Sequence, residues 1–348
     1  RRLQVPVVIT DVSQDRVDKG LAYCRAELDK LVEKGRLSVD DRNRYSANLS
    51  GTLDMNDFAD CDWVIEAVFE ELKVKHDVFT RVEAVVRPDA ILATNTSSLS
   101  VDEIGKVLKH PERLVGFHFF NPVAVMPLVE VVKAAKSNDV SVATAMRVAK
   151  DLKKTAVITS DSTGFVVNRL LGYLLGEAMK AVDEGIPFEE VADAIAPLGL
   201  PMNPFDLLEL VGLQVGAHVL DSMYGFAPDR FYKTDSLHQL AKLGRIRTKD
   251  SKGNKTGYDP EAIKIVSGRT RTRTKDQVFD DLIVGLTKEI KLMLDEKVVS
   301  SAEDIDLCMI MGAGWPFHLG GITPYLDRIG ASKKVFGATF HNPMIKGV

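Results

Sequence analysis

The sequence predicts an α/β fold, with a Rossmann-type doubly wound sheet in residues 1–159 followed by two tandem all-α helical modules. Up to Thr159, short β-branched and apolar runs alternate with longer helical patterns. This alternation is typical of a mostly parallel sheet that is covered by helices on both faces. After Asp161 the strand pattern stops and apolar residues recur at helical spacing. The length of 348 residues fits two to three domains.

Six strands are expected in the first part of the chain. They are residues 5–10, 62–68, 90–94, 114–120, 128–132 and 156–159. Between them, amphipathic spacing predicts helices over residues 13–35, 72–86, 101–108 and 139–152. The strands are nearly continuous apolar runs, which indicates that both faces of the sheet are buried.

The helical part of the chain contains an internal repeat. Residues 164–185 form a long amphipathic pattern that Gly185 closes. Several positions recur 112 or 113 residues later: Glu177 as Glu289, Asp193 as Asp306, Gly199 as Gly312, and Pro204-Phe205 as Pro316-Phe317. We therefore predict two copies of one helical module, residues 160–262 and 275–348, with the basic stretch 267–275 as a solvated linker. The alternative is a chance likeness between amphipathic helices.

Composition excludes several classes of protein. The net charge is −4 and no basic stripe is present, which argues against a nucleic-acid partner. No run of 18 apolar residues predicts a membrane span. The three cysteines, Cys24, Cys61 and Cys308, are too widely spaced for a disulfide framework or a zinc site. We therefore expect no bound metal and a reduced compartment: the cytoplasm, or the mitochondrial matrix in a eukaryote.

Asp11 directly follows the first expected strand. An acid at the end of the second strand of a dinucleotide fold accepts hydrogen bonds from the ribose hydroxyls and repels a 2′-phosphate, which favours NAD. The alternative role is a helix N-cap. A Gly-x-Gly-x-x-Gly loop is not found in the first half of the sequence, so we expect strand one and its phosphate loop to lie upstream of Arg1.

Three further positions are candidates for chemistry. His118 lies near the end of an apolar strand, where a packed histidine is the common alternative to a catalyst. Glu130 is a single acid among valines and needs a partner if it is buried, so we predict that it pairs with His118 on the neighbouring strand. A histidine paired with a carboxylate in this way can act as a general base that removes a proton from an alcohol. Asn168 lies on an apolar helical stripe, where its amide holds either substrate or an ordinary core bond.

These pieces resemble the L-3-hydroxyacyl-CoA dehydrogenase family. The matching strings are VIEAVFEELKVK at 64–75, TNTSSLS at 94–100, GFHFFNPVAVMPLVEVV at 116–132 and DSTGFVVNRLL at 161–171. Taken alone, TNTSSLS is better explained as a serine-rich N-cap for the following helix. The order and spacing of the strings also agree with the family, over nearly the whole chain.

The resemblance implies a role for each matched residue. His118 matches the catalytic base and Glu130 its paired carboxylate, while Ser97 and Asn168 match the residues that hold the substrate oxygen. The positions that match NAD contacts are Asp11, Glu70, Lys75, Asn95 and Asn121, together with Lys255 in the loop GNKTGYD (253–259).

Two helical copies in one chain are similar to the α subunit of the multifunctional fatty-acid β-oxidation complex. The resemblance then implies an acyl-CoA substrate, a preceding enoyl-CoA hydratase (lyase) domain and a thiolase subunit as partner. Two rival functions remain: a sugar-acid dehydrogenase on the same scaffold, and a non-catalytic scaffold like the lens crystallins derived from this family. We also expect weak NADH binding by this stretch alone, because of the missing phosphate loop.

Overall fold

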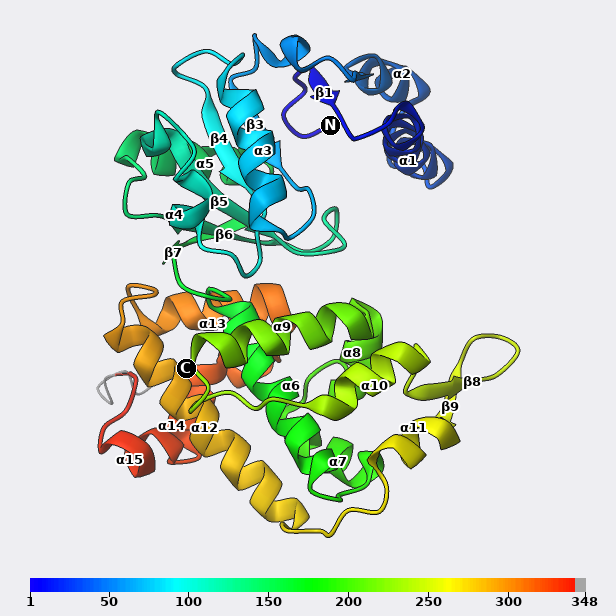
Figure 1. Cartoon of the computed structure of the whole chain (residues 1–348), viewed down its shortest axis with the longest axis vertical. Coiled ribbons are helices and arrows are strands. Elements are labelled where there is room, and N and C mark those ends of the chain that lie inside the picture. Colours follow the sequence, from blue (N-terminus) through cyan, green and yellow to red (C-terminus); the bar gives the residue numbers. More distant parts are fainter. Residues whose placement is uncertain (342–348) are drawn as a thin grey trace. The chain divides into compact units, whose positions relative to one another are not determined.

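The computed structural model describes residues 1–341, which fall into two compact units (Figure 1). The N-terminal unit contains residues 1–96, 101–117 and 133–156. The C-terminal unit contains residues 97–100, 118–132 and the chain from residue 157 onward. Neither unit is one continuous stretch of sequence. The division into domains of residues 1–159, 160–262 and 275–348 stays a proposal, and the last residues of the third, 342–348, lie outside the described part.

All six expected strands are present. A five-stranded sheet has the order β3-β4-β5-β6-β7, in which β3 (Trp63–Glu66), β4 (Ile91–Thr94) and β5 (Leu114–Phe119) are parallel. The remaining two strands are β6 (Leu128–Lys133) and β7 (Thr155–Ser160). The central strands are continuous apolar runs: β4 is buried at all four of its positions and β5 at five of six. This agrees with the prediction that both faces of the sheet are covered.

The first expected strand forms a separate small sheet. β1 (Val7–Ile9) pairs in parallel with β2 (Leu49–Gly51), and neither strand belongs to the five-stranded sheet. In this detail the structure differs from a single doubly wound sheet over residues 1–159. The sequence did not reveal β2, because its three residues, LSG, are too few to show an alternating pattern.

The predicted helices of the N-terminal unit are present with small changes at their ends. They are α1 (Gln14–Glu33), α3 (Leu72–Glu83), α4 (Val101–Gly105) and α5 (Asp139–Asp151). One unpredicted helix, α2 (Val39–Ala47), has no buried residue and begins at an N-cap, Ser38, whose side chain accepts from Asp41 N. Short 3₁₀ turns lie at Met55–Phe58 and Pro111–Arg113.

The C-terminal unit is mainly helical, as predicted. Its helices are α6 (Val167–Asp183), α7 (Phe188–Ile195), α8 (Pro204–Val211), α9 (Leu213–Phe226), α10 (Asp235–Leu243), α11 (Pro260–Val266), α12 (Lys275–Asp295), α13 (Ala302–Ala313), α14 (Ile322–Arg328) and α15 (Ala331–Phe336). Single 3₁₀ turns, Ala196–Leu198 and Phe317–Leu319, follow α7 and α13. One addition to the all-helical expectation is an antiparallel hairpin of β8 (Arg247–Lys249) and β9 (Lys255–Tyr258). Both strands are short and polar, so they gave no strand signal.

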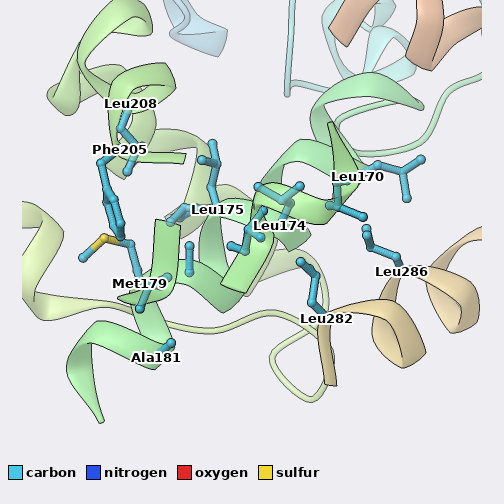
Figure 2. Close-up of a cluster of buried hydrophobic side chains, with 14 of the residues drawn as sticks. Leu170, Leu174, Leu175, Met179, Ala181, Phe205, Leu208, Leu282 and Leu286 are labelled. Carbon is cyan, nitrogen blue, oxygen red and sulfur yellow. The ribbon is translucent and has the colours of Figure 1, made fainter. Parts of the chain in front are cut away.

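One hydrophobic core joins the helices on both sides of the basic stretch 267–275. Figure 2 shows Leu170 and Leu174 of α6, Phe205 and Leu208 of α8, and Leu282 and Leu286 of α12 in this cluster. α6 and α12, far apart in sequence, pack side by side (Figure 1). Because the two helical segments bury their apolar faces against each other, we expect them to unfold together.

The repeat is matched at some positions and not at others. The long helix α6 and its counterpart α12 carry buried glutamates at the matched positions Glu177 and Glu289. In contrast, Phe205 is fully buried whereas its counterpart Phe317 is 78% exposed. Gly199 has a left-handed φ of 67°, while Gly312 lies inside α13. Superposition of the two segments stays a prediction, since the agreement is limited to the long helix.

Replacement of Leu282 by Ala is expected to lower the free energy of unfolding by about 2–5 kcal/mol. The side chain is fully buried and connects α12 to the shared core, so the change leaves a cavity there. Leu210→Ala is the matched control, because Leu210 is 69% exposed. Urea denaturation followed by circular dichroism measures both. Equal stability losses in the two variants would contradict a shared core at α12.

Candidate active site

His118 and Glu130 form the predicted pair. His118 lies near the end of β5 and Glu130 in β6, the next strand in the sheet order. The imidazole Nδ1 is 2.7 Å from the carboxylate Oε2. Glu130 is completely buried and His118 is 5% exposed. This confirms the hydrogen bond that the lone acid in LVEVV led us to expect.

The pair determines which nitrogen of the imidazole is free to take a proton. An ionised carboxylate can only accept hydrogen bonds, so Nδ1 carries the proton and Nε2 keeps its lone pair. The rings of Phe120 and Phe165 lie against the imidazole, with centroids 4.5 Å and 5.5 Å from its own. The ring is thus held in one orientation, with Nε2 available as a base.

The second oxygen of Glu130 binds the start of helix α6. Oε1 accepts hydrogen bonds from the backbone N–H groups of Val166 and Val167, at 3.0 Å and 3.1 Å. The first N–H groups of a helix lack partners within it, and the helix dipole favours a negative charge at that end. A single buried carboxylate therefore satisfies both the imidazole and the helix.

A tight turn brings the helix to Glu130. Gly164 and Phe165 both have left-handed backbones, with φ of 73° and 47°. A Cβ on Gly164 would lie 2.7 Å from the Cε of Met223, so only glycine fits there without movement. A left-handed backbone is unusual for a residue such as Phe, and here Phe165 is buried beside His118. The turn therefore shapes the site as well as the helix entry.

Asn168 and Ser97 belong to the same compact unit as the pair. Asn168 is the second residue of α6 and directly follows Val167, which donates to Glu130. Its side chain is half-buried and makes no hydrogen bond to other side chains or backbone groups of residues 1–341. Ser97 is also half-buried. Its segment, 97–100, is tied to the entry of α6 because Ser100 Oγ donates to Asp161 at 2.6 Å.

The expected NAD residues of the N-terminal unit follow three strand ends. Asp11 comes after β1, Glu70 after β3 and Asn95 after β4. The side chain of Asp11 is 42% exposed and accepts a 2.6 Å bond from its neighbour Val12 N. Its carboxylate therefore has oxygen lone pairs that face solvent, as a ribose site requires.

Lys75 was expected to contact NAD, but its side chain is buried between two carboxylates. It is 1% exposed, and its ammonium lies 2.8 Å from Glu66 and 3.2 Å from Glu70. Glu66 also accepts from Thr94 Oγ1 at 2.6 Å, and Glu70 from Thr96 Oγ1 at 2.6 Å. We interpret Lys75 as the residue that holds Glu70 in place, because a buried cation with two carboxylates has little surface left for a ligand.

Two expected NAD residues lie in the C-terminal unit. Asn121 is exposed and is joined to Pro122 by a cis peptide bond. Lys255, at the start of β9, lies 2.8 Å from Asp206 and 3.7 Å from Glu209 on α8. Its ion pairs tie the hairpin to α8, so a contact of Lys255 with a cofactor stays a prediction.

Sequence reasoning missed several buried charges, among them Arg169 and Glu66. Arg169 is completely buried in α6, and Glu66 is 3% exposed at the end of β3. Both could have been found by the argument used for Glu130, because each is a charged residue inside an apolar run. Cys308 of α13 was expected to be a structural thiol, and burial, assisted by the charge of Glu130, raises its pKa well above the usual value.

Two searches of the described residues gave negative findings. Within residues 1–341, no group of three or more His, Cys, Asp or Glu side chains is arranged to hold a metal ion. No helix in that range combines the length and the apolar character needed to cross a bilayer.

Comparison with known proteins covers most of the chain. Residues 2–162 match the family model of the 3-hydroxyacyl-CoA dehydrogenase NAD binding domain, and residues 164–256 match that of the C-terminal domain. The fatty acid oxidation complex subunit alpha of Pseudomonas putida is 35% identical over 346 residues, which is 95% of this chain and 48% of that protein. The chain thus spans about half the length of the curated relatives it matches.

Solved structures extend the likeness. The (S)-3-hydroxybutyryl-CoA dehydrogenase PaaH1 of Ralstonia eutropha is 30% identical, with a TM-score of 0.66 over 70% of this chain and 87% of that one. The 3-hydroxybutyryl-CoA dehydrogenase of Escherichia coli, 24% identical, shares the fold over 97% of this chain and 91% of its own, with a TM-score of 0.76. The two family models, the matched strings and these relatives agree: the chain belongs to the 3-hydroxyacyl-CoA dehydrogenase family.

Proposed function

We propose that the chain catalyses the NAD-dependent oxidation of an L-3-hydroxyacyl-CoA to the 3-ketoacyl-CoA in fatty-acid β-oxidation. The observation that carries the proposal is the buried His118–Glu130 pair, which leaves His118 Nε2 with a free lone pair beside the first turn of α6. That arrangement suits removal of a proton from an alcohol.

The residues of this chain have distinct tasks in the reaction. His118 Nε2 takes the proton of the substrate hydroxyl as the C3–H bond breaks and C3 becomes a carbonyl carbon. Glu130 keeps the imidazole oriented and balances the charge that it gains. Ser97 and Asn168 hold the reacting oxygen, a role that fits the unpaired, half-buried amide of Asn168. Positioning of the reacting groups in this way lowers the activation barrier of the oxidation by about several kcal/mol.

The cofactor fits the residues at the strand ends of the N-terminal unit. The exposed carboxylate of Asp11 suits the ribose hydroxyls of NAD. Glu70 and Asn95 follow β3 and β4, which belong to the five-stranded sheet and not to the small sheet that contains β1. The family resemblance also implies NAD contacts for Asn121 and Lys255. When bound, NAD accepts the hydride that leaves C3.

A spectrophotometric assay distinguishes this function from its rivals. We expect acetoacetyl-CoA to support NADH oxidation, read at the nicotinamide absorbance, and a sugar acid with NAD to support no reduction. The opposite preference would favour a sugar-acid dehydrogenase on the same scaffold. Inactivity towards both, in a folded protein that binds NADH, would favour a non-catalytic scaffold.

We also propose that the chain works as part of a larger β-oxidation enzyme. The support is the relative named as the alpha subunit of a fatty acid oxidation complex, of which the chain matches 48%. An enoyl-CoA hydratase domain and a thiolase subunit are the proposed partners. Co-purification of the full-length protein with a thiolase would support this assembly, and a full-length protein without hydratase activity would contradict it.

Asp11→Asn is expected to weaken NADH binding by about one to two orders of magnitude, because charge-assisted hydrogen bonds to the ribose are worth about 1.5–3 kcal/mol. NADPH binding is expected to weaken less, since the variant no longer repels the 2′-phosphate. NADH and NADPH fluorescence titrations measure both constants. Asp15→Asn is the control, because Asp15 is 72% exposed and paired with Lys19. An unchanged preference for NADH in Asp11→Asn would place the ribose elsewhere.

A further inference from the structure

Arg169 is the most deeply buried charge that the proposed reaction does not use. It is completely buried in the first turns of α6, one residue after Asn168. Its guanidinium donates to Glu289 through Nε and to Glu296 through Nη2, the latter at 2.6 Å. Both carboxylates belong to α12 and its C-cap, more than 100 residues away in sequence. A charge without access to water needs such partners, so the contact is a firm one.

The same guanidinium also holds the turn that precedes the helix. Nη1 of Arg169 donates to Ser162 Oγ at 3.0 Å, and its backbone N–H donates to Gly164 O at 3.1 Å. Ser162 O in turn accepts from Phe165 N at 2.9 Å. The left-handed residues Gly164 and Phe165 therefore lie inside a loop that Arg169 closes. This is the turn that aims Val166 N and Val167 N at Glu130.

A second cation reinforces the carboxylates. Arg230 donates to Glu289, with Nε at 3.1 Å from Oε2, and to Glu296 at 3.2 Å. The ring of Phe226 contacts both guanidiniums, with its centroid 5.3 Å from Cζ of Arg169 and 5.4 Å from Cζ of Arg230. Two cations and two anions thus balance in one cluster, and the planar guanidinium of each arginine can bind both carboxylates at once.

An independent contact from α13 reaches the same place. Gly312 lies so close to β6 and α6 that a Cβ there would be 2.6 Å from Leu128 Cδ2 and 2.8 Å from Val167 Cγ2. Leu128 lies two residues before Glu130, and Val167 donates to it. Two contacts therefore support the surroundings of Glu130. Helix α12 contributes ion pairs to Arg169, and helix α13 contributes close packing of Gly312 on Leu128 and Val167.

We infer that Arg169, with Glu289 and Glu296, is a positioning residue of the active site, through which the helices after residue 275 set the geometry of Glu130 and Asn168. Three successive residues of α6 then have three tasks: Val167 donates to Glu130, Asn168 faces the substrate, and Arg169 anchors both to α12. The inference rests on the proposed roles of His118, Glu130 and Asn168. The two family models match only residues within 2–256. The inference adds that the roles of His118, Glu130 and Asn168 depend on a segment that follows this matched part.

The chain contains a matched control for this cluster. Arg273, just before α12, binds Glu177 and Glu184, the latter at 2.5 Å. These glutamates, on α6 and its C-cap, have the same seven-residue spacing as Glu289 and Glu296. Arg273 also donates to Asp281 of α12 at 2.8 Å, so this cluster joins the same two helices. However, Glu177 lies ten residues after Val167, about 15 Å along the helix from the end that binds Glu130. Arg273→Met therefore weakens the packing of α6 on α12 without touching the site.

The experiment compares Arg169→Lys and Glu296→Gln with Arg273→Met in the whole protein. Lysine keeps the charge of Arg169 but cannot bind Ser162, Glu289 and Glu296 together. Glu296 is 37% exposed, so its replacement is the milder change for folding. We expect kcat with acetoacetyl-CoA to fall at least about tenfold in both, because small displacements of positioned groups cost up to 10²-fold. Arg273→Met should keep kcat within about twofold of the parent, even if its melting temperature falls as much as those of Arg169→Lys and Glu296→Gln.

Two readouts that need no turnover accompany the assay. Amide exchange of Val166 and Val167, measured by NMR, should accelerate in Arg169→Lys and Glu296→Gln and stay slow in Arg273→Met. The ¹⁵N shifts of His118, one of seven histidines, should lose the pattern of a single Nδ1–H tautomer in the first two variants only.

The outcomes separate this inference from the proposed function. If His118→Ala retains full activity, the proposed function fails. If His118→Ala is inactive but Arg169→Lys and Glu296→Gln match Arg273→Met in kcat, exchange and ¹⁵N shifts, the cluster is merely structural and the inference is overturned. Gly312→Ala, which acts through packing instead of charge, should repeat the result of Arg169→Lys.

Discussion

Replacement of His118 by Ala is expected to lower kcat by about 10²–10⁴-fold, the range that a positioned general base contributes. The variant removes Nε2, the nitrogen whose lone pair the pairing with Glu130 leaves free. Binding of NADH should stay within about twofold, because the proposed ribose contact at Asp11 is unchanged. Steady-state assays with acetoacetyl-CoA and NADH titrations measure the two effects.

His110→Ala is the control for His118→Ala. His110 also lies beside a glutamate, with Nδ1 3.2 Å from Glu112, but the side chains of both are about half exposed. Its replacement should leave kcat unchanged. If the two histidine variants lose the same activity, or if neither loses any, His118 is not the base.

Glu130→Gln is expected to lower kcat by a comparable factor, about 10²–10⁴, although it preserves the shape of the side chain. The two N–H donors of Val166 and Val167 require an acceptor, so the amide oxygen must take the place of Oε1. The amide NH₂ then faces His118 Nδ1 and donates to it. That forces the imidazole proton onto Nε2, the nitrogen that should act as base.

The ¹⁵N spectrum of His118 tests this reversal directly, since the two tautomers differ in their ring-nitrogen shifts. Loss of the negative charge at the start of α6 should also reduce the free energy of unfolding by about 0.3–2 kcal/mol. Glu112→Gln, beside the exposed His110, is the control and should change neither property. An Nδ1–H tautomer with normal activity in Glu130→Gln would contradict the role given to the carboxylate.

Much of the fold could be predicted because its elements have strong local patterns. The strand runs at 90–94 and 128–132 became β4 and β6 with at most one residue of difference at an end. The helix expected over 72–86 appears as α3, with Phe79 and Val82 buried as the 3.6-residue period requires. Elements without a pattern, such as β2 and the β8–β9 hairpin, were missed.

The part of the site that could be predicted from the sequence follows from one physical rule about buried charges. A lone acid in an apolar strand needs a partner, and this placed His118 opposite Glu130. The rule applies equally to Arg169 and Glu66, but their partners lie on other elements, and sequence spacing does not say which. The expected accessibility of Lys75 also could not be judged, since its burial depends on Glu66 and Glu70 folding around it.

The sequence by itself determined the class of fold, the strands and helices with clear periodicity, the family resemblance and the pairing of His118 with Glu130. These follow from local spacing and from the cost of burying a single charge. Only the tertiary structure decided that the other oxygen of Glu130 binds the start of α6, that Arg169 reaches Glu289 and Glu296, and that Gly312 packs on Val167. Each of these contacts joins residues 36 or more positions apart, where no local period acts. Their partners are chosen by which helices share a core.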